Sequence, residues 1–131
     1  REVMLVEYEV TSENYNGPIS LLAMLGGSEN VQNWYPLMNH LGANQCWLWL
    51  QLHDIDIQLC YAMSWQVLHN NCPIERRPIK IEKPHTIGYS LTTKIKAGES
   101  CLLRKYVAVV DSRYHKKENL IMDAIKCLTN L

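Results

Sequence analysis

The stretch WLWLQLHDIDIQLCYAMSW, residues 47–65, contains two β-prone runs around a polar break. Residues 47–52 and 57–65 are rich in aromatic and aliphatic side chains, and the four residues between them have the length of a hairpin connection. In the first run, Trp47 and Trp49 fall on one face and leucines on the other, because side chains alternate along a strand. This pattern predicts a long β-hairpin whose first strand is buried between two layers.

Two further strands are predicted before this hairpin. Residues 3–10 begin apolar and then alternate with Glu7 and Glu9, whereas residues 19–25 form a short apolar run. The segment between them, residues 11–18, is dense in turn-forming residues, so the two strands should pair as a hairpin. Residues 27–43 show no clear period, and we interpret them as loop.

The second half of the chain predicts a third hairpin and a helix. Residues 89–95 and 101–110 flank a Lys-Ala-Gly-Glu turn, and residues 70–85 carry three prolines, which restricts them to loop or an edge strand. After residue 116 the apolar side chains follow a helical period. They are Leu120, Ile121, Ala124, Ile125 and Leu128. We therefore expect a mostly β chain: an antiparallel β-sandwich with one C-terminal amphipathic helix, forming a single domain over residues 1–131.

The composition indicates a folded, cytoplasmic protein. There is no signal peptide pattern and no apolar run of about 18 residues, so no membrane partner is expected. The cysteines are odd in number and widely spaced, which favours reduced thiols. They are Cys46, Cys60, Cys72, Cys101 and Cys127. Because the chain opens at Arg1 without an initiator Met, we expect a fragment of a longer protein.

No motif indicates catalysis or metal binding. His53, Asp54 and Asp56 occupy one tight turn, where neighbouring side chains diverge, so a solvated turn is the better interpretation. Gly26 and Gly27 are not followed by a phosphate-loop pattern, and no Cys-x-x-Cys, His-Glu-x-x-His or Gly-x-Ser-x-Gly occurs. We assign no catalytic, cofactor-binding or metal-ligating residue, expect no cofactor, and identify no substrate-binding residue.

The basic residues and the tryptophans each allow two interpretations of their role. The basic residues of the second half suggest phosphate or nucleic-acid contact, but charged side chains on strands normally occupy the solvent face. We therefore interpret them as solvated and expect no nucleic-acid partner. They are the stretch from Arg76-Arg77 through Lys80 to Lys83, together with Lys94, Lys96, Arg104 and Lys105. The four tryptophans suggest a sugar-stacking platform, yet tryptophan on a strand is mostly core. We assign Trp47, Trp49 and Trp65 to the core and leave Trp34, in the loop, open.

Two blocks of sequence carry a family resemblance. The first is VEYEVTSENYNGPI at residues 6–19, followed by VQN at 31–33. The second comprises KAGES at 96–100, LRKYVAVVDSR at 103–113 and the helix that contains Ala124. Their order and spacing resemble the N-terminal domain of glycoside hydrolase family 65, whose members include maltose, trehalose and kojibiose phosphorylases.

The resemblance implies that the chain is the later part of an N-terminal sandwich domain, a partial super-sandwich. Its partner would be a C-terminal helical-barrel catalytic domain that this chain lacks, and the sandwich can contribute to a homodimer contact. The parent would be an inverting phosphorylase or hydrolase acting on α-linked glucosides, with phosphate in the first case, while the chain alone would not be catalytic. The alternative is a stand-alone sandwich that binds carbohydrate through exposed tryptophans or binds another protein.

Overall fold

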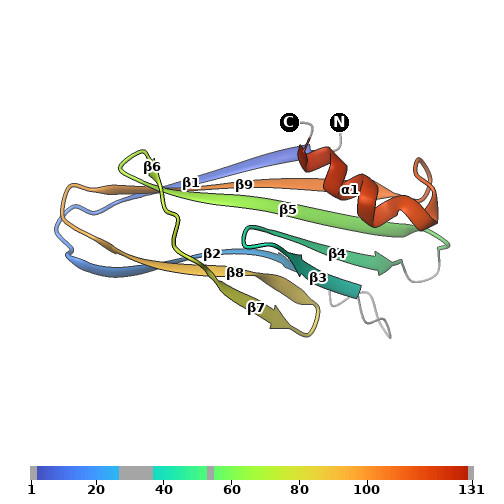
Figure 1. Ribbon diagram of the computed structural model, residues 1–131, viewed down its shortest axis with the longest axis horizontal. Helices are drawn as coiled ribbons and strands as arrows, with labels where there is room; N and C mark the ends of the chain where they lie inside the picture. Colours follow the sequence, from blue (N-terminus) through green and yellow to red (C-terminus); the bar gives the residue numbers. More distant parts are fainter. Residues whose placement is uncertain (1–2, 27–36, 53–54, 130–131) are drawn as a thin grey trace.

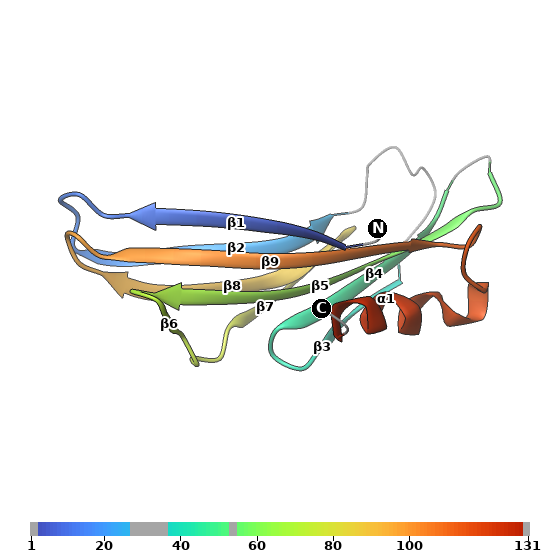
Figure 2. The same ribbon diagram turned by 90° about the horizontal axis from the view of Figure 1, so that it is seen from above.

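The structure is a computed structural model that describes residues 3–26, 37–52 and 55–129 (Figures 1 and 2). Within these ranges the chain forms nine strands, a 3₁₀ turn and one α-helix. The strands are β1 (Val3–Thr11), β2 (Gly17–Gly26), β3 (Leu37–Leu41), β4 (Gln45–Gln51), β5 (Gln58–His69), β6 (Cys72–Pro73), β7 (Ile79–Lys83), β8 (Thr86–Ile95) and β9 (Ser100–Asp111). The helical elements are η1 (Lys117–Asn119) and α1 (Leu120–Thr129).

The strands form two antiparallel sheets that face each other (Figure 1). Sheet A has the order β1-β9-β5-β4-β3, and the two-residue β6 pairs with the end of β5. Sheet B has the order β2-β8-β7. The expected antiparallel sandwich with a helix near the C-terminus is therefore confirmed, because α1 is the one α-helix of the described residues and follows all the strands.

The predicted central hairpin is confirmed, since β4 pairs with β5 from Gln45↔Ser64 to Gln51↔Gln58. The other two predicted hairpins are wrong. Strand β1 pairs with β9, and β2 pairs with β8, so residues 12–16 and 96–99 each carry the chain from one sheet to the other. The two connections are bonded to each other at Ser12, whose N–H donates to Glu99 O and whose carbonyl accepts from Gly98 N. Connections of this length span the roughly 10 Å between packed sheets, which is why turn signals alone did not identify the pairing.

Two segments without a strong strand pattern also join the sheets. The prediction of loop over residues 27–43 is wrong for Leu37–Leu41, because β3 pairs with β4 at the edge of sheet A. Within residues 70–85, β7 is the edge strand of sheet B, as the prolines suggested. Before β7, the connection from β6 crosses from sheet A to sheet B over the side of the sandwich (Figure 1).

Strand β4 separates two hydrophobic cores. Leu48 and Leu50 are buried between the two sheets. Trp47 and Trp49 pack on the opposite face of sheet A, under α1, which lies on the outer side of that sheet (Figure 2). The side chains of α1 buried there are Leu120, Ala124 and Leu128. The prediction of a first strand buried on both faces is confirmed.

Among the described residues, no helix has the length and apolar character needed to cross a membrane.

Candidate functional site: a groove beside the β6–β7 connection

A break in the hydrogen-bond ladder of β5 creates a cavity at the side of the sandwich. The pairing of β4 with β5 ends at Ser64, and the pairing with β6 begins at Leu68. Between these points two backbone bonds hold the edge: Trp65 N–H donates to Asn44 O at 3.1 Å, and Ile74 N–H donates to Val67 O at 2.9 Å. The cavity has a volume of about 230 Å³. Its lining comprises Ala43, Asn44, Trp65, Gln66, Val67, Ile74, Glu75, Arg76, Pro78 and Leu91.

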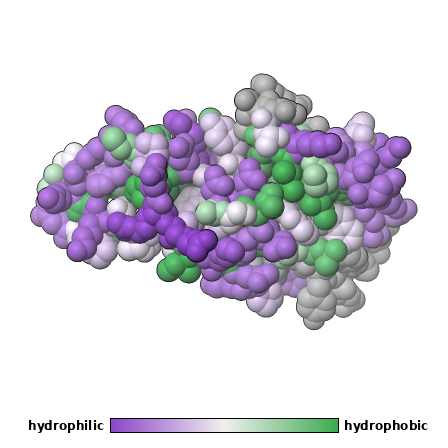
Figure 3. Space-filling model, viewed as in Figure 1, coloured by the Kyte–Doolittle hydropathy of each residue, from purple (hydrophilic) through white to green (hydrophobic). Residues whose placement is uncertain are grey.

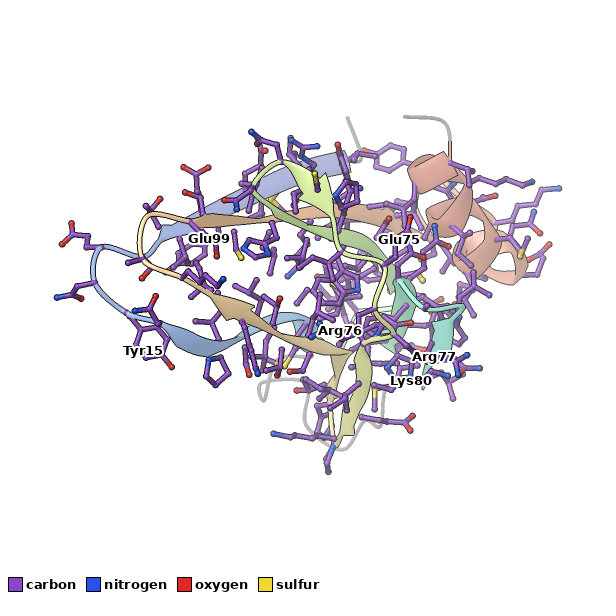
Figure 4. All side chains as sticks on the ribbon, turned by 60° about the vertical axis from the view of Figure 1, so that its left-hand side comes forward. Tyr15, Glu75, Arg76, Arg77, Lys80 and Glu99 are labelled. Atoms are coloured by element: carbon purple, nitrogen blue, oxygen red, sulfur yellow. The ribbon has the colours of Figure 1, made fainter. Side chains whose placement is uncertain are left out.

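A second hollow adjoins this cavity and shares Ala43 and Pro78 with it. The second hollow is also lined by Gly42, Arg77, Lys80 and Tyr89. We call the two adjoining hollows the 43/78 groove. Figure 3 shows strongly hydrophilic side chains on this face, where the β6–β7 connection crosses it, and Figure 4 shows Arg76, Arg77 and Lys80 emerging from that connection and from β7.

Aromatic residues support the groove from inside. The rings of Trp65 and Tyr89 stack with centroids 5.9 Å apart, and His40 meets Tyr89 edge-on at 4.9 Å. The Tyr89 hydroxyl donates to the carbonyl of Gln45 at 2.6 Å and to that of Gly42 at 3.2 Å, and burial raises the pKa of this phenol to about 12. The rings of Trp65 and Tyr89 are almost fully buried, so they offer no face on which a sugar can stack.

The polar groups of the groove are mostly hydrogen-bond donors. The Arg76 guanidinium donates from Nη1 to Thr92 O at 2.6 Å, which fixes this side chain against β8. Within the described parts of the chain, Arg77 and Lys80 have no ion pair or side-chain hydrogen bond. The indole N–H of Trp65 is buried without an acceptor in the same parts of the chain. Glu75 is the one carboxylate among the described residues that line either hollow. The groove is therefore suited to ligands that accept hydrogen bonds and carry negative charge.

The residues weighed as metal ligands do not form a site in the described structure. His53 and Asp54 lie outside the described residues, and Asp56 accepts from Lys117 Nζ at 2.9 Å, which makes it part of an exposed ion pair. No group of three or more histidine, cysteine or acidic side chains is arranged to hold a metal ion among the described residues. Gly26 ends β2 as expected, and Gly27 lies outside the described residues.

The cysteines within the sandwich are poor nucleophiles. Cys46 and Cys60 are fully buried, and burial raises the pKa of each thiol to about 12. Burial also raises the pKa of Cys101, whereas Cys72 is exposed. Because the thiolate is the reactive form, the three buried cysteines are core residues, as the sequence indicated.

The predicted places of the tryptophans and the basic residues are mostly confirmed. Trp65 belongs to the core between the sheets, and Trp47 and Trp49 are partly buried under α1, while Trp34 lies outside the described residues. The prediction that Lys105 occupies the solvent face is wrong. Its Nζ donates to Met24 O at 2.7 Å, and burial lowers the pKa of this ammonium.

The sequence also missed the groove, because the residues that line it are brought together by strand pairing across both sheets. The single local signal is the pair Arg76-Arg77 between Pro73 and Pro78, and the sequence pattern alone favours a solvated face for it.

Comparisons with known proteins place the chain in a family. The model for "Glycosyl hydrolase family 65, N-terminal domain" matches residues 1–131. A solved structure of a protein assigned as a kojibiose phosphorylase from the human microbiome has the same fold, with a TM-score of 0.75 and 14% sequence identity. The alignment covers 98% of this chain and 17% of that chain. No curated protein matches the sequence. The chain belongs to the N-terminal domain family of the family 65 glycosyl hydrolases.

Proposed function

We propose that the chain is a non-catalytic sandwich segment of a longer enzyme that cleaves α-linked glucosides with inversion, by phosphorolysis. The observation that carries this proposal is the family match over residues 1–131. The chain spans about 17% of the length of the structural relative, so the activity, substrates and partners of a whole protein are part of the proposal.

The chemistry of the 43/78 groove supports a non-catalytic role. Glycoside hydrolysis uses a pair of carboxyl groups on opposite sides of the scissile bond. Glu75 is the single carboxylate among the described residues lining the groove, and it lies beside Arg76 in sequence. An inverting phosphorylase needs a general acid but no carboxylate base, because phosphate itself attacks the sugar. In this proposal the general acid and the phosphate-binding residues belong to a helical-barrel domain, which packs against the sandwich.

The proposed reaction has a defined stereochemical outcome. A carboxylic acid of the barrel protonates the leaving glycosidic oxygen while phosphate attacks the anomeric carbon from the opposite face. Attack on an α-glucoside with inversion gives β-glucose 1-phosphate. If water takes the place of phosphate, a second carboxylate of the barrel must accept its proton as general base; the product is then β-glucose, and the enzyme is a hydrolase.

The test uses the full coding sequence around this chain. The purified longer protein is incubated with a panel of α-linked glucose disaccharides and phosphate, and the anomeric signals are followed by NMR. We expect the β-phosphate to form with at least one disaccharide. Formation of the α-phosphate, or no reaction with any α-glucoside, would contradict the proposal, and glucose release without phosphate would place the protein in the hydrolase branch.

The non-catalytic role of the chain is tested with variants of the longer protein. Glu75→Gln should leave the rate of phosphorolysis within about threefold of the wild type, since a lost catalytic carboxyl group costs orders of magnitude more. The matched control is Glu82→Gln on β7, which removes the same charge outside both hollows. A loss of more than a hundredfold in Glu75→Gln alone would make Glu75 a catalytic residue.

A further inference from the structure

The second hollow of the 43/78 groove brings together two cationic side chains that have no partner within the described residues. Arg77 and Lys80 both line it, and neither makes an ion pair or side-chain hydrogen bond within the described residues. Exposed arginine and lysine side chains on a flat surface are usually hydrated. Here both side chains are exposed but flank the same concave site of about 570 Å³, so their two positive charges act on one space.

The walls that carry these cations are fixed by contacts on both sides. Lys80 stands opposite Tyr89 in the β7–β8 ladder, and Pro78 restricts the backbone just before β7. On the facing wall, the Tyr89 hydroxyl bonds the carbonyls of Gly42 and Gln45, which positions the β3–β4 turn against the same hollow. The backbone around the hollow is thus in place before any ligand arrives, so that binding has to order only the Arg77 and Lys80 side chains.

The chemistry of the hollow selects an anion with several oxygen acceptors. A guanidinium presents paired N–H donors that match the oxygens of a tetrahedral oxyanion, and an ammonium adds a point charge. No carboxylate lines this hollow among the described residues, so nothing there competes for the cations. Its volume exceeds that of a bare tetrahedral ion and falls within the roughly 300–1,000 Å³ of sites for small organic molecules.

The geometry points to a binding site for a small organic anion whose charged end is a phosphate- or sulfate-type oxyanion. Arg77 and Lys80 hold the oxyanion, and the body of the ligand rests against the apolar wall formed by Ala43 and Pro78. This site lies on the sandwich and does not rest on the proposed phosphorolysis. Nucleic acid is a poorer fit, because the aromatic rings at the groove are buried and cannot stack on bases.

Binding is tested on the 131-residue chain with inorganic phosphate and inorganic sulfate as probes. Each is titrated at constant ionic strength, balanced with sodium chloride, while backbone amide signals are followed by NMR. We expect saturable amide shifts for Gly42, Ala43, Arg77, Ile79 and Lys80 with both probes. If only phosphate produces them, the charged end is a phosphate; if only sulfate does, it is a sulfate. No saturable shift with either would overturn the proposal.

Two double variants separate a site from general charge attraction. Arg77→Gln with Lys80→Gln should weaken binding at least about tenfold, because two charge-assisted contacts are lost. Lys83→Gln with Lys94→Gln removes the same net charge outside both hollows and should change affinity less than about twofold. Amide spectra of both variants establish that they are folded. Equal weakening in the two variants would overturn the proposal.

An acidic peptide is the competing occupant of this surface. Hexaglutamate is titrated under the same conditions. Tighter binding of hexaglutamate than of phosphate, lost in the Arg77→Gln, Lys80→Gln variant, would overturn the small-molecule assignment and make the hollow a docking point for an acidic segment. Weaker binding of the peptide supports the assignment.

Discussion

The phenol of Tyr89 in β8 donates a 2.6 Å hydrogen bond to the backbone carbonyl of Gln45 in β4. This bond joins the two sheets, because β8 lies in sheet B and β4 in sheet A. It also holds the β3–β4 turn, since the same hydroxyl reaches the Gly42 carbonyl. Tyr89 is fully buried and stacks on Trp65, so the bond sits in surroundings where an unpaired carbonyl is costly.

We expect Tyr89→Phe to lower the free energy of unfolding by about 1–2 kcal/mol, because it removes the donor from two part-buried hydrogen bonds that join the sheets. The matched control is Tyr61→Phe. Tyr61 packs against the same core but makes no side-chain hydrogen bond within the described residues. Removal of the hydroxyl in Tyr61→Phe should change the free energy of unfolding by less than about 0.5 kcal/mol. Denaturant unfolding of the three proteins measures both effects, and equal losses would show that the bond across the sheets contributes nothing specific.

The same phenol makes stability sensitive to alkali. Burial raises its pKa from 10.0 to about 12, so the folded protein holds this proton more tightly than the unfolded chain. The stabilisation is complete below pH 10 and is lost as the pH rises toward 12. In unfolding measurements at increasing pH, the difference between the wild type and Tyr89→Phe should shrink above pH 10. A constant difference across this range would be inconsistent with a buried, protonated phenol.

Gly88 is required by the close approach of β2 to β8. A Cβ at this position would overlap the carbonyl oxygen of Ala23 and lie 2.7 Å from Met24 Cα, both in the backbone of β2. We expect Gly88→Ala to destabilise the protein by at least about 2 kcal/mol, because backbone atoms of a paired strand must move. Gly26→Ala in the same ladder is the control, since its nearest neighbour would be Thr86 Oγ1 at 4.0 Å. Thermal unfolding that ranks the two variants equally would contradict this account.

Local periodicity identified strands but not their partners. The strands at 3–10 and 19–25 were found from their patterns, yet β1 pairs with β9 and β2 with β8. A turn-rich connection looks the same in sequence whether it reverses the chain within a sheet or between two sheets. The deciding interactions, such as the bonds between Ser12 and the backbone of Gly98 and Glu99, join residues more than eighty positions apart. The β4–β5 hairpin was identified because its strand composition, break and pairing are all local.

The 43/78 groove could not be predicted from the sequence either, because it is also formed by residues from separate segments. Trp65, Tyr89 and Arg77 come from three separate segments, and the cavity depends on where β4 stops pairing with β5. A basic pair between prolines has no chemical meaning until its neighbours in space are known. Lys105 illustrates the opposite error, because a lysine in an alternating strand suggests solvent while its ammonium reaches across to the Met24 carbonyl.

Glu99, in the connection between β8 and β9, should make the stability of the sandwich sensitive to acid. Its carboxylate accepts from Lys96 N–H at 2.7 Å, His69 Nε2 at 3.1 Å and Asn70 Nδ2 at 3.0 Å (Figure 4 labels its position). These bonds, the one from Lys96 foremost, lower the pKa of Glu99 below its ordinary 4.5. The stabilisation is therefore present above pH 4.5 and lost as the pH falls through the lower folded value.

We expect Glu99→Gln to melt below the wild type at neutral pH, with the difference narrowing as the pH is lowered to about 3. Glu13→Gln is the control, because Glu13 is exposed on the neighbouring connection and accepts no hydrogen bond within the described residues. It should match the wild type at both pH values. Scanning calorimetry at neutral and acid pH measures the melting temperatures. A difference between the wild type and Glu99→Gln that widens in acid would show that the Glu99 carboxylate does not stabilise the folded state.

Strand β1 should make the isolated chain self-associate. It lies at the edge of sheet A with β9 as its neighbour, and it exposes Met4, Leu5 and Tyr8 on alternate faces, with Tyr8 61% exposed. An apolar edge strand offers unpaired backbone groups to a second chain, and a charged side chain on it blocks such pairing.

We expect the wild type to associate with increasing concentration in sedimentation velocity. The double variant Leu5→Lys, Tyr8→Lys should remain monomeric. Met122→Lys is the control, because Met122 is 56% exposed but lies on α1. If this control abolishes association and the β1 variant does not, the contact lies on the helix face and the edge of β1 is protected by its own twist and by Glu7 and Glu9.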